Sequence, residues 1–272
     1  MKYFGEGLSE KHKELSRIIR KEEKLEQAKT LFLEIHSKLN LSGMEKAEEP
    51  IINSASAQTC MRDKIERKAL STIDFLSAKA DREDKNETDN LLRDLSKEEY
   101  ALMPTNKDET IAWVLWHIAR IEDLTVNMLI AGKKQIFNEE WKKRLNVSIS
   151  DTGNAMSDDE IMELSRNIDI DELLRYRKEV AKRTREVVMD LKASDMKRKV
   201  LPGALTDIQA VGGVTEHPDS IWLLDYWGKK DVAGILLMPP TRHVMLHLND
   251  CCKWKEHIRS KKKIFAGDQL EE

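Results

Sequence analysis

The chain has 272 residues, 46 of them basic and 49 acidic, with a formal net charge of -3. Phosphate-backbone binding usually shows as a clear positive excess, so we expect no nucleic-acid partner. No stretch reaches the roughly 18 apolar residues of a membrane span, and the three cysteines form no paired framework, so we expect a protein of the reducing cytoplasm that contacts no membrane.

The N-terminal third of the chain is predicted to be mostly helical. Glycine and proline are scarce, and apolar residues recur with the 3.6-residue spacing of helices. The pattern predicts a first helix over residues 9–39 and a second over 61–80. Residues 41–57 form an expected loop, and a short helix is expected over 90–100.

The next helix is predicted over 109–131, behind polar residues at 105–109 that can cap its first turn. Its apolar stripe consists of Trp113, His117, Ile121, Leu124 and Met128. Arg120, one turn after His117, lies on the flank of this stripe. His117 is therefore expected in the middle of a buried face.

The segment after this helix is less regular. Residues 133–154 show a weak pattern and are expected to form a loop. A capping box predicts a short helix over 157–167, and a strongly amphipathic helix is predicted over 171–192. Residues 201–216 hold several glycines and no sustained period, so they are expected to be irregular.

The last long helix opens at Pro239-Pro240, because proline is tolerated in a first turn, and should end near residue 263. Its inward-facing residues are His243, His247, Cys251, Trp254 and Ile258. The i, i+4 spacing of the two histidines stacks their imidazoles on one helix face.

If the helices carrying His117 and the His243/His247 pair lie side by side, the three rings converge inside a bundle. One ion could then reach all three at the usual metal–nitrogen distances of about 2.0–2.1 Å. The alternative is three structural histidines, each hydrogen-bonded to a carbonyl or a carboxylate. The metal interpretation is favoured, because unpaired imidazoles side by side in a core are costly.

Two motifs also carry a family resemblance: Trp113-Val-Leu-Trp-His117-Ile-Ala-Arg and, far downstream, Thr241-Arg-His243-Val-Met-Leu-His247-Leu. In these the chain resembles the DinB/YfiT-like superfamily of four-helix bundles. The resemblance implies an all-α fold and a single domain over residues 1–272. The segments at about 41–104 and 133–238 exceed what the compact family needs and are expected to be helical and irregular insertions.

The resemblance implies that His117, His243 and His247 bind a divalent metal, and that the protein is a homodimer. Nitrogen ligation suits Zn, Ni or Fe, and three protein ligands leave positions open for water or substrate. Members of the superfamily include transferases that use low-molecular-weight thiols, hydrolase-like proteins and iron-dependent sulfoxide synthase domains. The resemblance therefore implies a metal site more firmly than any one reaction.

Four further residues are candidates with open alternatives. Asp250 could accept a ring N–H or act as a base, or be an exposed carboxylate. Arg120 could bind an anionic substrate or form a surface ion pair. His36 could be a fourth ligand, a pocket wall or a boundary residue of its helix. Cys251 could be a ligand or a small buried hydrophobe.

These observations predict a metal-dependent transferase, thiol-dependent in the leading hypothesis, or a hydrolase. Its substrate would be a small molecule, and a metal-bound water or thiolate would be the nucleophile. A non-catalytic metal- or small-ligand-binding stress-response module is the alternative. A helical interaction scaffold with structural histidines is a third.

Overall fold

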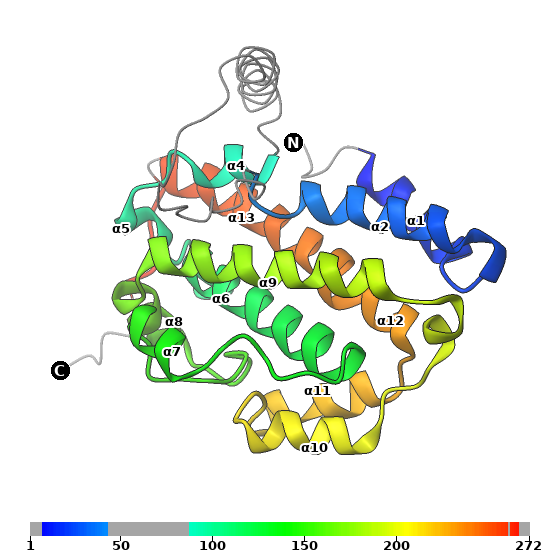
Figure 1. The fold of residues 1–272 in the computed structure, drawn as a ribbon. Coiled ribbons are helices and arrows are strands. Elements are labelled where there is room, and N and C mark those ends of the chain that lie inside the picture. The colour runs from blue at the N-terminus through cyan, green and yellow to red at the C-terminus, as the bar shows by residue number, and fades with distance from the viewer. Residues whose placement is uncertain (1–6, 43–86, 261, 267–272) are drawn as a thin grey trace, which may run out of the picture.

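The computed structural model describes residues 7–42, 87–260 and 262–266, which fold into helices and their connections (Figure 1). Apart from two isolated bridges, Met103 with Phe265 and Lys199 with Asp231, this described part contains no β-structure. The predicted all-α class is confirmed. The helix predicted over 61–80 and most of the loop predicted over 41–57 lie outside the described residues.

The described helices are α1 (Leu8–Ile18), α2 (Leu25–Lys38), α4 (Glu87–Leu92), α5 (Lys97–Tyr100), α6 (Ile111–Glu122), α7 (Glu139–Arg144), α8 (Asp158–Asn167), α9 (Ile170–Asp190), α10 (Pro202–Ala210), α11 (Pro218–Gly228), α12 (Val232–Leu236) and α13 (Val244–Arg259). Two wider π-helical segments adjoin them: η2 (Asp123–Ile130) continues α6, and η4 (Met238–His243) leads into α13. None of these described helices is both long and apolar enough to cross a lipid bilayer.

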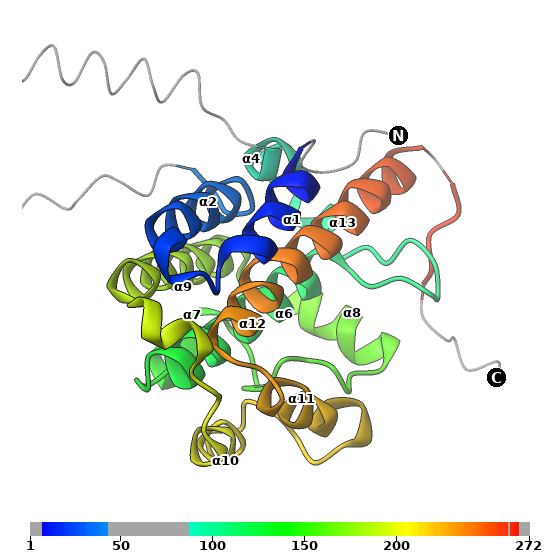
Figure 2. The same ribbon diagram turned by 90° about the vertical axis from the view of Figure 1, so that its right-hand side faces the viewer.

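The helices α2, α6, α9 and α13 form the bundle. Helix α6 packs against α9 and α13, and α2 packs against α9. Figure 2 shows α6 enclosed by its neighbours. All 12 residues of α6 are buried. The predicted helix over 109–131 is therefore present as α6 and η2, but it is surrounded on every side instead of burying only one stripe.

The prediction of a single helix over 9–39 is wrong, because the chain turns back between α1 and α2. The turn follows Ile19 and consists of five charged residues, 20–24, which offer no apolar side chain for burial. Arg20 stabilises the turn by donating two hydrogen bonds to Asp231, 2.6 and 2.8 Å long. The two helices then pack against each other side by side (Figure 1).

Because of this turn, α1 lies against the bundle and its His12 is buried. Its ring Nε2 lies 2.8 Å from the Leu237 carbonyl oxygen, just before η4. Burial lowers the pKa of His12, and the Leu237 carbonyl partly offsets that effect. The histidine thus attaches α1 to the bundle instead of facing water.

Residues 201–216, expected to be irregular, contain the helix α10. Pro202 occupies its first turn, where the missing N–H is not needed, and Ile208 is fully buried. Gly212 follows with a positive φ of 68°, which glycine adopts without strain. Helix α10 packs against α11 and η2, at the bottom of the view in Figure 1.

The short helix predicted over 90–100 is divided into α4 and α5. A capping box at Ser96 and Glu99 starts α5: the Ser96 hydroxyl accepts from the Glu99 N–H, and the Glu99 carboxylate accepts from the Ser96 N–H. The loop predicted over 133–154 likewise contains α7, which Asn138 caps. Helix α8 and its capping box at Ser157 are present as predicted.

Candidate metal centre

The first histidine of the centre, His117, comes from the middle of α6. The helix begins after Thr110, whose side chain accepts a hydrogen bond from the Trp113 N–H at 3.1 Å. Nine of the 12 residues of α6 are apolar, so the helix lies in the bundle interior. Only 3% of the surface of His117 is exposed.

The other two histidines come from the junction of η4 and α13. Pro239 and Pro240 lack a backbone N–H, and the chain passes through the wider π turn of η4 before the regular helix begins. His243 ends η4, and His247 follows one turn later. Their ring centroids are 4.6 Å apart, with the rings nearly perpendicular at 83°.

Because α13 packs against α6, the three predicted histidines meet. The Nε2 atom of His243 lies 3.1 Å from Nε2 of His117 and 3.1 Å from Nε2 of His247. All three nitrogens lie within 4.8 Å of one another. His117 is buried, whereas His243 and His247 keep part of their surface exposed.

The three Nε2 atoms of this cluster cannot all form proper hydrogen bonds with one another. His117 Nδ1 lies 2.8 Å from the Thr152 carbonyl oxygen, so it carries the proton and donates it, which leaves Nε2 as a bare lone pair. Nε2 of His243 faces two nitrogens, but an N–H there can point at only one of them. At least one contact therefore lacks a proper hydrogen bond, and a shared cation would satisfy all three lone pairs.

Burial keeps these imidazoles in the neutral form that binds metals. Burial first, and repulsion from His247 second, lower the pKa of His117 to about 3. The pKa of His243 is also far below its usual value, because of burial and the two neighbouring histidines. Burial lowers the pKa of His247 as well, and the negative charge of Asp250 partly offsets this.

An indole ring supports the centre from the buried side. Trp113 stacks on His117, with ring centroids 4.6 Å apart and an interplanar angle of 12°, and meets His247 edge-on at 6.3 Å. Gly153, whose φ is +76°, lies against the nitrogen edge of the indole. A Cβ atom at Gly153 would lie 2.7 Å from the indole nitrogen of Trp113.

Gly153→Ala is therefore expected to disturb the centre as well as the fold. The left-handed backbone should cost about 1–3 kcal/mol of unfolding free energy, and the new methyl group should push Trp113 away from His117. Urea unfolding and the near-ultraviolet circular dichroism of tryptophan measure the two effects. Gly132→Ala is the matched control, because Gly132 also has a positive φ, +61°, but no atom within 4 Å of its would-be Cβ. Equal spectra for both variants would contradict the predicted contact.

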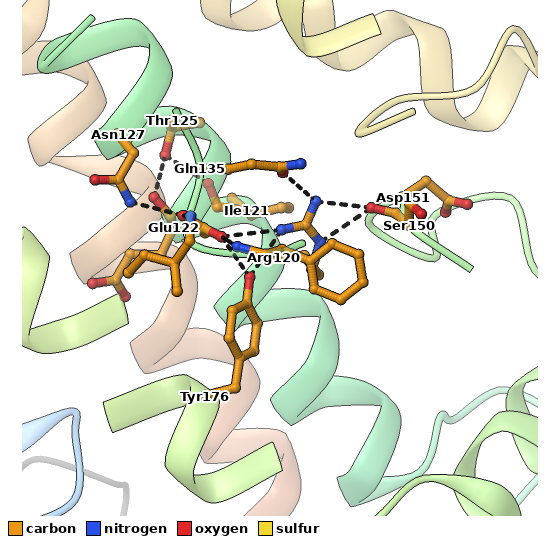
Figure 3. A network of polar contacts seen from close by, with 12 residues as sticks. Arg120, Ile121, Glu122, Thr125, Asn127, Gln135, Ser150, Asp151 and Tyr176 are labelled. Atoms are coloured by element: carbon orange, nitrogen blue, oxygen red, sulfur yellow. Dashed lines mark hydrogen bonds and ion pairs between the residues drawn. The ribbon is translucent and has the colours of Figure 1, made fainter. Parts of the chain in front are cut away.

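Arg120 does not face the histidines but lies fully buried in a separate polar network (Figure 3). Its guanidinium donates to the Ser150 carbonyl oxygen at 2.8 and 3.1 Å and to the Tyr176 hydroxyl at 2.8 Å. It also pairs with Asp123 at 3.2 Å. This position does not match the predicted substrate contact, because protein groups already accept the hydrogen bonds of the guanidinium. It does not match the alternative surface ion pair either, because Arg120 is fully buried.

Asp250 lies on α13, three residues after His247, with 43% of its side chain exposed. Its carboxylate accepts a hydrogen bond from Lys253 Nζ at 2.7 Å. Its charge acts on His247 through space, as the pKa of that histidine shows. The position matches the exposed-carboxylate alternative, and the role of a catalytic base stays a prediction.

His36 and Cys251 are fully buried in the bundle core, and neither belongs to the three-histidine group. His36 is fully buried, and its Nε2 lies 2.8 Å from Glu122, which also accepts from the Thr184 hydroxyl at 2.6 Å. Burial alone would raise the pKa of Glu122, but His36, Thr184 and Arg177 hold it below its usual value. Burial raises the pKa of the Cys251 thiol far above its usual range, as expected for a small buried hydrophobe.

The sequence interpretation did not identify the carbonyl of Thr152 or the carboxylate of Glu122. A carbonyl carries no side-chain signal, so Thr152 could not have been found. Glu122 could have been, because it is one of only three charged residues in the otherwise apolar segment 110–131. In the described residues, the group that could hold a metal comprises His117, His243 and His247.

The fold and site define an all-α bundle with a candidate three-histidine metal centre. A family model described as the DinB superfamily matches residues 80–249, which include all three histidines. The chain belongs to the DinB superfamily, as its two motifs predicted. No curated protein matches the sequence.

Proposed function

We propose that this protein binds a divalent metal through His117, His243 and His247. The proposal depends on one observation: three imidazole nitrogens from two helices lie within 4.8 Å of one another, with too few protons to satisfy them as hydrogen-bond partners. The ligand type suits Zn, Ni or Fe. A divalent ion at such a site with open coordination positions acts as a Lewis acid towards a water molecule or a thiol.

The chain's own residues prepare this site in three ways. The Thr152 carbonyl oxygen holds the Nδ1 proton of His117 and so keeps its Nε2 available. The Trp113 indole covers the buried side of the His117 ring. His243 and His247 are only partly buried, and this exposure would give a substrate access to the centre.

We further propose that the protein is a metal-dependent enzyme, with thiol-dependent transfer ahead of hydrolysis. The number of ligands supports this proposal: among the described residues the group comprises three side chains, whereas a purely structural metal site is closed by a fourth protein ligand. Its substrates would be a small molecule and, for the transferase, a thiol of low molecular weight. The homodimer, the cytoplasmic location and the single domain over residues 1–272 stay predictions.

Elemental analysis of the purified chain, with His243→Ala beside it, tests the metal proposal. His243 touches both other histidines, so its removal should weaken binding by more than the roughly 10–100-fold typical of outer residues around a metal. His257→Ala is the matched control, because His257 lies on the same helix and contacts the Lys263 carbonyl instead of the cluster. Retained stoichiometric metal in His243→Ala would refute the proposal.

Transfer assays on the metal-loaded protein test the enzymatic part. Turnover with a low-molecular-weight thiol and an electrophilic acceptor would support the transferase, and turnover of esters or amides would support the hydrolase. Metal binding without turnover in either series would favour the non-catalytic binding module. Loss of turnover in Asp250→Asn, with the metal retained, would identify Asp250 as the base.

A further inference from the structure

The loop at residues 150–152 lies along α6. Each of its three backbone carbonyl groups accepts a hydrogen bond from a side chain of that helix. In chain order, the three carbonyl oxygens accept from the Arg120 guanidinium at 2.8 and 3.1 Å, from the Trp116 indole N–H at 3.1 Å and from His117 Nδ1 at 2.8 Å. The three donors lie on adjacent turns of one helix. The hydrogen bond to His117 is therefore one of several that attach this loop to α6.

Arg120 is the firmest of these attachments. It places two N–H groups on a single carbonyl, and its other donors are held by Asp123, Tyr176 and Gln135 at 3.2, 2.8 and 2.8 Å. The guanidinium also lies 4.4 Å from the centroid of the Phe137 ring. Figure 3 shows Gln135, Ser150 and Tyr176 around the guanidinium of Arg120, and the contacts from several directions hold this group in place.

The end of the loop decides which nitrogen of His117 is available. A neutral imidazole carries one proton, on either Nδ1 or Nε2, and its hydrogen-bond partner selects between them. With the Thr152 carbonyl oxygen 2.8 Å from Nδ1, the proton stays there, and Nε2 faces His243 and His247 as a lone pair. If the loop shifted, Nε2 could take up the proton and the ring could rotate.

We propose that Arg120 is a positioning residue for the metal centre. It holds residues 150–152 against α6, so that the Thr152 carbonyl oxygen locks His117 in the tautomer and orientation that point Nε2 at the other two histidines. This inference rests on the proposed metal-binding function, which it deepens. It also gives the buried arginine a role that does not require contact with a substrate.

Arg120→Lys tests the proposal, because lysine keeps the positive charge beside Asp123 but cannot reproduce the planar set of bonds. We expect Zn²⁺ affinity, measured by competition with a chromophoric chelator, to fall on the order of 10-fold, as for other residues that orient a metal ligand. In the metal-free protein, nitrogen-15 NMR of the His117 ring should show loss of the pure Nδ1–H tautomer. A merely structural role would leave that signal unchanged.

Arg177→Lys is the matched control, because Arg177 is also a fully buried arginine that donates to a carbonyl, that of Leu39 at 2.6 Å. It should lower stability without changing the His117 tautomer, and Zn²⁺ affinity should stay within about twofold. Unchanged affinity and tautomer in Arg120→Lys would overturn the proposal. So would an equal loss of affinity in both variants.

If Arg120→Lys does not fold, Trp116→Phe decides the matter. Phenylalanine keeps a ring in the core but removes the N–H that holds the middle carbonyl of the loop. Weakened Zn²⁺ binding with a mixed His117 tautomer is expected, and wild-type values for both would overturn the proposal. Failure of the wild-type protein itself to bind Zn²⁺ would instead refute the proposed function.

Discussion

Asp123→Ala is expected to lower the free energy of unfolding by about 3–5 kcal/mol, because it leaves the buried charge of Arg120 without its partner. Neither side chain of this pair is exposed. The Asp123 carboxylate also accepts from Arg120 Nη1 (3.2 Å), the Tyr176 hydroxyl (2.6 Å), the Asn127 amide (2.7 Å) and the backbone N–H groups of Ile136 (2.8 Å) and Phe137 (2.9 Å). The substitution would strand both backbone donors in the interior as well.

Urea unfolding of the metal-free protein measures this loss, and Glu186→Ala provides the control. Glu186 forms an ion pair with Arg183 at 3.2 Å on the outer face of α9, where both side chains are substantially exposed. Such surface pairs contribute about 0.5 kcal/mol or less. A loss below about 1 kcal/mol in Asp123→Ala would show that water reaches the guanidinium and that the pair is not a buried one.

The three-histidine cluster could be predicted from the sequence because its signals are local. The i, i+4 spacing of His243 and His247 places both rings on one face of any helix, and Pro239-Pro240 marks where that helix starts. The apolar stripe through His117 indicates a buried helix. What spacing alone could not give was the contact between α6 and α13, which the family resemblance supplied.

The buried polar network could not be predicted by the same reasoning. Periodicity separates an apolar face from a polar one, and Arg120 lies on the flank of the apolar stripe, where a surface ion pair is a natural expectation. Its partner Tyr176 is more than fifty residues away in the sequence. One signal was available: a helix as apolar as 110–131 must be central, and the few charges of a central helix must be paired.

The break between α1 and α2 was missed for a related reason. Apolar residues continue with helical spacing on both sides of residues 20–24, so the pattern alone favours one long helix. The turn is decided by tertiary contacts, namely the pair between Arg20 and Asp231 and the bond from His12 to the Leu237 carbonyl. Contacts with residues more than 200 positions away leave no trace in local periodicity.

The metal-free protein is expected to lose stability as the pH falls below about 6.5, the ordinary pKa of histidine in an unfolded chain. In the fold, burial and repulsion from His247 lower the pKa of His117 to about 3, and burial lowers the pKa of His243, His247 and His12 as well. Between these values the unfolded chain binds more protons than the native one, so the free energy of unfolding decreases with falling pH. Each histidine contributes up to about 1.4 kcal/mol per pH unit.

Urea unfolding between about pH 6.5 and pH 5 isolates this effect, because carboxylates titrate mainly below that window. His117→Leu should reduce the slope by up to about 1.4 kcal/mol per pH unit, since it removes one site at which the unfolded chain takes up a proton. A slope that is flat, or that has the opposite sign, would mean that the fold does not lower the pKa of these rings. The two properties have one cause: burial that excludes the imidazolium destabilises the empty protein in acid, and the same burial leaves three lone pairs free for a cation.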